Sequence, residues 1–104
     1  MILQETSGHF EIEQIQAFFL RIKPLVDAGL SQDEILQVQK ATHSMPVDST
    51  REFVFPIEFR GNYTALRIRI FMDEHEVPEI SFFTHRDLAE AINDQMISFL
   101  RAEG

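Results

Sequence analysis

Residues 52–72 read EFVFPIEFRGNYTALRIRIFM, and this stretch decides the fold. Its first half places Phe or Ile at every second position from Phe53 to Phe59. Strict alternation with a period of two predicts a β-strand that buries one of its faces. Gly61-Asn62 then predicts a two-residue type II′ turn, and the alternation resumes from Tyr63 to about Met72. The stretch therefore predicts a β-hairpin.

The two-residue turn also predicts how the two strands pair. It sets Ile57 opposite Leu66 and Phe55 opposite Ile68, and directly opposed residues share one face of a sheet. A shift by one residue would place the two arginines of the second strand on the buried face, where an unpaired charge is costly. Pro56 has no amide to donate to a ladder, so the first strand is predicted to lie at an edge of the sheet.

Helical periodicity flanks the hairpin on both sides. Apolar residues recur at helical spacing from Ile12 to Val26 and again from Leu88 to Leu100. Pro24 predicts the end of the first helix, because it cannot continue the backbone hydrogen bonding. A second helix is predicted to begin at Ser31, where Ser31 and Glu34 have the spacing of a capping box.

The remaining segments complete the predicted order of elements. Val77 to Phe83 is predicted to form a third strand, and Thr84 to cap the last helix. Residues 1–8 show no periodicity and are interpreted as a loose N-terminal arm. The sequence thus predicts one α+β domain over residues 1–104, in the order α-α-β-β-β-α. Its sheet would be a three-stranded antiparallel meander, with the helices packed on the Phe-rich face.

Composition and charge narrow the classes of function. The chain has 104 residues, a formal net charge of -8 and no cysteine. Thiol chemistry and zinc–thiolate sites are therefore excluded, and the absence of cysteine fits a cytoplasmic protein. The negative charge disfavours nucleic acids and anionic membranes as partners, because both need clustered cations. No stretch predicts a membrane span, a signal peptide or a phosphate-binding loop, and no cofactor is expected.

Candidate catalytic and metal-ligating residues are sparse. No catalytic residue is predicted, because the sequence has no G-x-S-x-G motif and no cysteine. The weak metal-ligand candidates are Asp73, His75, Glu76 and His85. Three of them lie in one acidic turn, which a solvated loop explains equally well. The sequence favours a non-enzymatic protein and leaves catalysis open.

The second face of the predicted sheet is the candidate interaction surface. The candidate interface residues on it are Val54, Arg67, Arg69, Phe71 and Phe83. Aromatic residues and arginine are enriched at protein interfaces. We therefore expect a non-enzymatic interaction or regulatory domain, a homodimer or a protein-binding module, that uses the outer face or an edge of its sheet. Two alternatives stay open: a small-molecule site or active site between sheet and helices, and an outer face that the N-terminal arm or the first helix covers.

Overall fold

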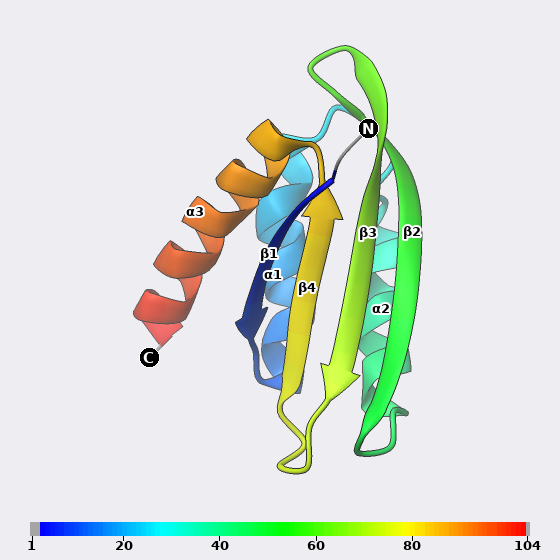
Figure 1. Ribbon diagram of the computed structural model, residues 1–104, viewed down its shortest axis with the longest axis vertical. Helices are drawn as coiled ribbons and strands as arrows, with labels where there is room; N and C mark the ends of the chain where they lie inside the picture. The colour runs from blue at the N-terminus through cyan, green and yellow to red at the C-terminus, as the bar shows by residue number, and fades with distance from the viewer. Residues whose placement is uncertain (1–2, 104) are drawn as a thin grey trace.

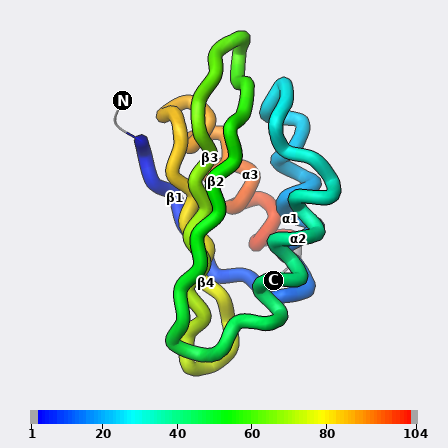
Figure 2. Tube along the Cα trace, turned by 90° about the vertical axis from the view of Figure 1, so that its right-hand side faces the viewer, coloured from blue at the N-terminus to red at the C-terminus, as the bar shows by residue number. Residues whose placement is uncertain are grey.

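The computed structural model describes residues 3–103 as a four-stranded antiparallel sheet with helices on one face (Figure 1). The elements in chain order are β1 (Gln4–His9), the 3₁₀ turn η1 (Ile12–Gln14), α1 (Ile15–Ile22), the 3₁₀ turn η2 (Lys23–Leu25), α2 (Gln32–His43), β2 (Ser49–Phe59), β3 (Asn62–Met72), β4 (Pro78–Thr84) and α3 (Arg86–Glu103). The strand order across the sheet is β1-β4-β3-β2. Figure 2 shows the sheet and the helices as two layers. The α+β class and the helices on one face are confirmed, while the expectation of three strands is wrong.

The fourth strand comes from the segment interpreted as a loose arm. Gln4–His9 forms β1 and pairs antiparallel with β4, from Gln4 opposite Thr84 to His9 opposite Glu79. Its residues are polar or small, so the sequence shows no apolar alternation. The strand forms because the backbone of β4 supplies its hydrogen-bond partners. Gly8 lets α3 approach closely, since a Cβ at this position would overlap Sδ of Met96.

The strands β2 and β3 form the predicted hairpin, but their register differs from the prediction by two residues. Phe55 lies opposite Leu66, and Ile57 lies opposite Thr64. The turn is Arg60-Gly61, with φ of 52° and 78°, so it is of type I′ and not of type II′. A shift of two leaves every side chain on its predicted face, because the side-chain period is two. The apolar alternation therefore cannot distinguish the two registers.

The first two helices end and begin where the sequence predicts. The α-helix α1 ends at Ile22, and Pro24 lies in the 3₁₀ turn that follows. At the start of α2, the backbone N–H of Glu34 donates to Oγ of Ser31 at 3.2 Å, and the backbone N–H of Ser31 donates to Oε1 of Glu34 at 3.1 Å. This reciprocal pair confirms the capping box.

The predicted cap of the last helix is wrong by one residue. Thr84 is the last residue of β4, and its buried hydroxyl donates to the carbonyl oxygen of Ala65 at 2.8 Å. His85 caps α3 instead, because the backbone N–H of Asp87 donates to Nδ1 of His85 at 3.1 Å. The threonine hydroxyl finds its partner on the neighbouring strand, so it is not available to the helix.

Buried apolar side chains fill the space between the sheet and the helices. One connected cluster spans the chain from Phe10 to Phe99. Its aromatic centre is Phe18, whose ring centroid lies 5.0 Å from that of Phe10, 5.9 Å from that of Phe82 and 5.3 Å from that of Phe99. Each of these rings is almost completely buried, which contributes about 1.5–3 kcal/mol per ring.

Candidate functional site

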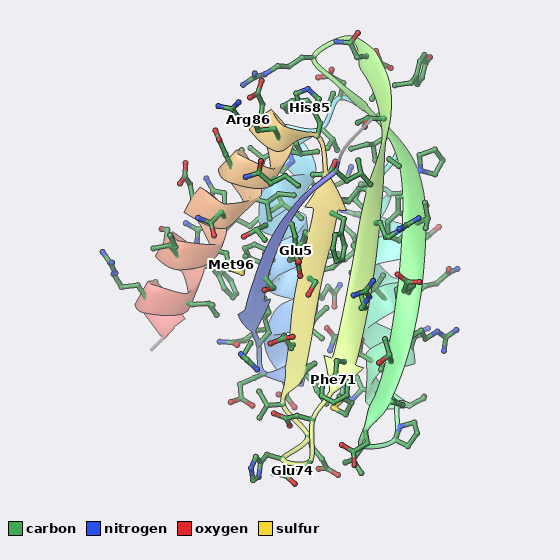
Figure 3. All side chains as sticks on the ribbon, in the orientation of Figure 1. Glu5, Phe71, Glu74, His85, Arg86 and Met96 are labelled. Carbon is green, nitrogen blue, oxygen red and sulfur yellow. The ribbon has the colours of Figure 1, made fainter. Side chains whose placement is uncertain are left out.

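All five predicted interface residues lie on the outer face of the sheet, the face opposite the helices. Figure 3 looks onto this face, with Glu5 and Phe71 in front of the ribbon and Met96 behind it. No helix of residues 3–103 crosses the outer face, and β1 lies in the plane of the sheet beside β4. Within the described part of the chain, the expected alternative of an intramolecular cover is therefore wrong.

The observed register arranges the outer face in three rows that cross all four strands. From β1 to β2 the first row is Glu5, Phe83, Arg67 and Val54, the second is Ser7, Ser81, Arg69 and Glu52, and the third is His9, Glu79, Phe71 and Thr50. Two arginines thus occupy the middle of the face, and acidic residues lie toward both edges.

The two phenylalanines do not form one continuous patch. Phe83 lies opposite Arg67 and Phe71 lies opposite Glu79, so the row of Arg69 separates them. The guanidinium carbon of Arg69 lies 5.0 Å from the ring centroid of Phe83. The apolar side chains of this face are therefore interleaved with arginines.

The arginines of this face are not equivalent. Nε of Arg69 lies 3.5 Å from Oε1 of Glu52, directly across the strand pair, where the predicted register allowed only a diagonal approach. This pair is exposed and contributes about 0–1 kcal/mol. Arg67 lies opposite Val54 and makes no ion pair with a residue in the range 3–103. Its guanidinium is the unpaired cation at the centre of the face.

Sequence reasoning missed three residues of this face. Tyr63 is 84% exposed and lies on the same face of β3 as Arg67. Glu5 and His9 belong to β1, the segment that was interpreted as an arm. A signal for the missing strand was present in Ile80 to Phe83, which is apolar or small at every position. Such a run is typical of a strand buried between two neighbours, and β4 indeed lies inside the sheet.

Three of the four metal-ligand candidates, Asp73, His75 and Glu76, lie in the turn between β3 and β4. Oδ1 of Asp73 accepts the backbone N–H groups of Val77 and His75, each at 2.9 Å. The hydrogen bond from Val77 is the largest cause that lowers the pKa of Asp73 below its ordinary value, and the bond from His75 adds to it. His85 lies at the opposite end of the sheet from this turn (Figure 3). Among the described residues, no group of three or more His, Asp or Glu side chains could hold a metal ion.

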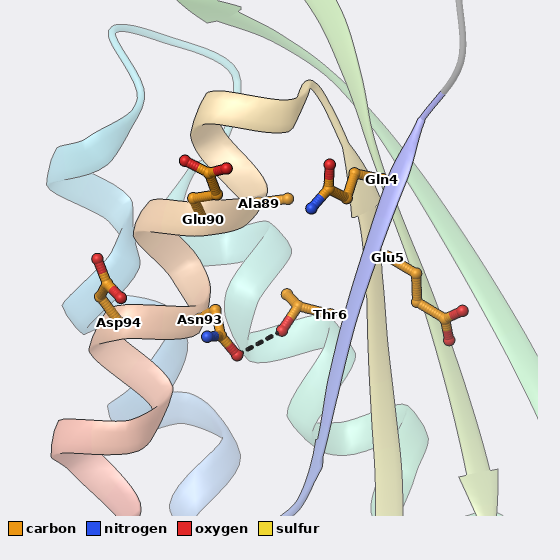
Figure 4. Close-up of a pocket in the computed structure, with 7 residues that line it drawn as sticks. All are labelled: Gln4, Glu5, Thr6, Ala89, Glu90, Asn93 and Asp94. Carbon is orange, nitrogen blue, oxygen red and sulfur yellow. Dashed lines mark hydrogen bonds between the residues drawn. The ribbon is translucent and has the colours of Figure 1, made fainter.

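A polar groove lies between β1 and α3. Its volume is about 380 Å³, and its lining is Gln4, Glu5, Thr6, Ala89, Glu90, Asn93 and Asp94. Figure 4 shows that Glu5 points away from the groove, while Thr6 and Asn93 point toward each other. The hydroxyl of Thr6 donates to Oδ1 of Asn93 at 2.8 Å. These two polar groups satisfy one another, so they do not converge on a ligand.

A second hollow lies at the tip of the β2–β3 hairpin and has a volume of about 400 Å³. Rings of Phe59, Tyr63 and His85 contribute to its lining. Its two charged groups are paired, since NH1 of Arg60 lies 3.2 Å from Oδ2 of Asp87. A small-molecule site needs polar groups that are free to fix a ligand. In both hollows a central polar pair, Thr6 with Asn93 and Arg60 with Asp87, is satisfied within the protein.

No helix within residues 3–103 is long and apolar enough to cross a membrane. Comparisons of the chain with protein-family models, with curated proteins and with solved structures find no match.

Proposed function

We propose that the protein is a non-enzymatic protein-interaction or regulatory domain that binds a protein partner through the outer face of its sheet. The observation that carries this proposal is the composition of that face: Arg67, which is exposed and makes no ion pair within residues 3–103, lies between Val54 and Phe83 in one row. Phe71 and Tyr63 lie farther along β3 on the same face. Val54 is 56% exposed and Phe71 is 37% exposed. Aromatic side chains and arginine are the residues that most often supply binding energy at protein interfaces.

The chemistry of the face indicates the chemistry of the partner. A partner would offer a carboxylate to Arg67 and apolar side chains to Val54 and Phe83 on either side of it, and both a second copy and a different protein can do so. The alternative function, a small-molecule or active site between sheet and helices, has less support, because that space is filled by buried side chains. We also propose a cytoplasmic location, which the cysteine-free composition favours.

The test compares Phe71→Glu with Leu36→Glu. Phe71 is 37% exposed on the outer face and Leu36 is 38% exposed on α2, so the two variants place the same charge at equal exposure on different surfaces. Each variant and the wild type serve as bait in an extract of the native host, and light scattering measures self-association of each. The proposal expects partners, or a second copy, to be retained by the wild type and by Leu36→Glu and lost from Phe71→Glu. Identical partners and identical self-association for all three proteins would contradict it.

A further inference from the structure

The two edges of the sheet differ in how their backbone groups are used. In an antiparallel pair, the N–H and C=O groups of successive residues point alternately toward and away from the neighbouring strand. On β2, the backbone N–H and C=O groups of the even-numbered residues point away from β3, as the hydrogen bonds of Glu58 with Ala28 and Asp27 show. Just after β1, the backbone N–H of Phe10 donates to the carbonyl oxygen of Pro78, so the even-numbered residues direct their backbone groups toward β4. The backbone groups of the odd-numbered residues of β1 therefore point away from β4.

The β2 edge is closed. The backbone N–H of Glu58 donates to the carbonyl oxygen of Ala28 at 2.9 Å, and the backbone N–H of Asp27 donates to the carbonyl oxygen of Glu58 at 2.7 Å. Pro56, two residues earlier, stands at an outward position and has no N–H to offer. Natural sheets commonly use such devices to prevent further strand pairing.

The backbone of the β1 edge is open, while α3 runs alongside it on the helix side of the sheet (Figure 1). The outward residues of β1 are Glu5, Ser7 and His9, and all three are exposed. Their backbone groups make no hydrogen bond to other elements within residues 3–103. The strand contains no proline and no lysine, which are the residues that usually protect an edge. An edge of this kind is a template for one more antiparallel strand.

We propose that β1 pairs antiparallel with β1 of a second copy, so that two four-stranded sheets join into one across a two-fold axis at Ser7. In this register Ser7 lies opposite Ser7 of the second copy, and Glu5 lies opposite His9. By symmetry, His9 also lies opposite Glu5 of the second copy. Each of the three pairs uses outward backbone groups and makes two backbone hydrogen bonds. An interface of this symmetry is isologous and closes at a dimer. The inference concerns a different surface from the outer face and goes beyond the function proposed above.

The side chains of β1 favour this register over those centred on Glu5 or His9. Centring the two-fold axis on Glu5 would place two carboxylates opposite each other, and centring it on His9 would place two histidines opposite each other. Centring it on Ser7 places an acidic side chain opposite a basic one at both ends. Nε2 of His9 already lies 3.5 Å from Oε2 of Glu79, so each His9 would lie between two carboxylates. The strand is thus complementary to itself.

The helix side of the same edge has an apolar residue without cover. Ile97 on α3 is 51% exposed. It lies four residues after Asn93, so it shares the flank of α3 that contacts β1 through Thr6. Figure 1 shows α3 alongside β1 and extending beyond its free edge. A second copy joined at β1 would bring its own α3 to this flank and cover Ile97.

The test replaces Ser7 by proline and by alanine. Ser7→Pro removes one outward N–H from each copy and no bond of the β1–β4 ladder, and Pro56 shows that this sheet accepts proline at an outward position. Ser7→Ala keeps the N–H and is the matched control. Light scattering should find the wild type and Ser7→Ala dimeric. Self-association of Ser7→Pro should be about 30-fold weaker, because two net hydrogen bonds are lost, with an unchanged circular dichroism spectrum.

A crosslinking experiment keeps the inference falsifiable if the proline variant folds poorly. The chain has no cysteine, so Ser7→Cys carries a single thiol. Opposed residues of a hydrogen-bonded pair have Cα atoms about 5.5 Å apart, which a disulfide can bridge. Mild oxidation should link Ser7→Cys into covalent dimers. The control Thr50→Cys, exposed at an outward position of the β2 edge, should stay monomeric.

The outcomes separate this inference from the proposed function. A wild type that is monomeric at high concentration, equal crosslinking of Ser7→Cys and Thr50→Cys, or a dimer that Ser7→Pro leaves intact would each overturn pairing at β1. If Phe71→Glu dissociates a dimer that Ser7→Pro leaves intact, the outer face is the self-contact and only the edge inference fails. If Ser7→Pro alone dissociates the dimer, the edge inference stands, and the extract experiment decides the role of the outer face.

Discussion

Glu58 on β2 and Ala28 in the loop before α2 are joined through their backbones, since the N–H of Glu58 donates to the carbonyl oxygen of Ala28 at 2.9 Å. This bond closes one edge of the sheet with a segment of the same chain. It depends on Gly29, which has φ of 102° and lies against the backbone of Pro56 and Ile57. A Cβ at Gly29 would overlap the carbonyl oxygen of Pro56. The edge therefore stays closed because the next residue is glycine.

Gly29→Ala should destabilise the protein more than Gly61→Ala. Both glycines have positive φ, which costs an alanine roughly 1–2 kcal/mol. A Cβ at Gly61 meets no heavy atom within 4 Å, whereas a Cβ at Gly29 overlaps β2. Urea unfolding of both variants measures the difference in free energy of unfolding. Equal losses would show that the loop moves away from β2 at no cost.

A double-cysteine pair should report the register of the hairpin. Val54 lies directly opposite Arg67 in a pair without hydrogen bonds, where Cα atoms are about 4.5 Å apart and a disulfide fits. We expect Val54→Cys with Arg67→Cys to form an intramolecular disulfide on oxidation. Val54→Cys combined with Arg69→Cys should form little disulfide, because the Cα atoms of a diagonal pair are about 7–8 Å apart. The reverse result, read by thiol titration of monomers, would restore the register predicted from the turn.

Asp73→Asn should lower stability at neutral pH and lose its effect in acid. The backbone hydrogen bonds from Val77 and His75 lower the pKa of Asp73 in the folded protein. Because the pKa of Asp73 is lower in the folded than in the unfolded protein, its carboxylate stabilises the fold at pH values above the unfolded pKa of about 3.9. This stabilisation is lost as the pH falls through the pKa of the folded state. The melting temperatures of wild type and variant should therefore differ at pH 7 and converge in strong acid. Glu74→Gln, in the same turn, is the control, and an equal effect of both variants would contradict the assigned role.

His85→Ala should weaken the start of α3. The substitution removes the acceptor Nδ1 that the N–H of Asp87 uses, and loss of a helix cap costs about 0.5–2 kcal/mol. His85→Asp should retain most of this free energy, because a carboxylate can accept the same N–H and complements the helix dipole. Thermal unfolding followed by circular dichroism measures both variants. Equal destabilisation by Ala and Asp would show that His85 acts through its ring contact with Phe59 and not as a cap.

Local patterns were sufficient wherever a feature depends on neighbours in the chain. The alternation of Phe53 to Phe59 determined the strand and its buried face, Pro24 determined the end of the first helix, and Ser31 with Glu34 determined the start of the second. The five candidate interface residues were also correctly assigned to one face, because an error of two residues in register does not change the side on which a side chain lies.

Tertiary structure decided what depends on partners far along the chain. Gln4–His9 is a strand because β4 offers it a free backbone, and nothing in its own polar sequence requires that conformation. The register of the hairpin follows from the conformation of Arg60-Gly61, and the separation of Phe71 from Phe83 follows from the pairing of β3 with β4. The contrast between an open β1 edge and a closed β2 edge arises in the same way, because backbone hydrogen bonds between strands carry no periodic signal in the side chains.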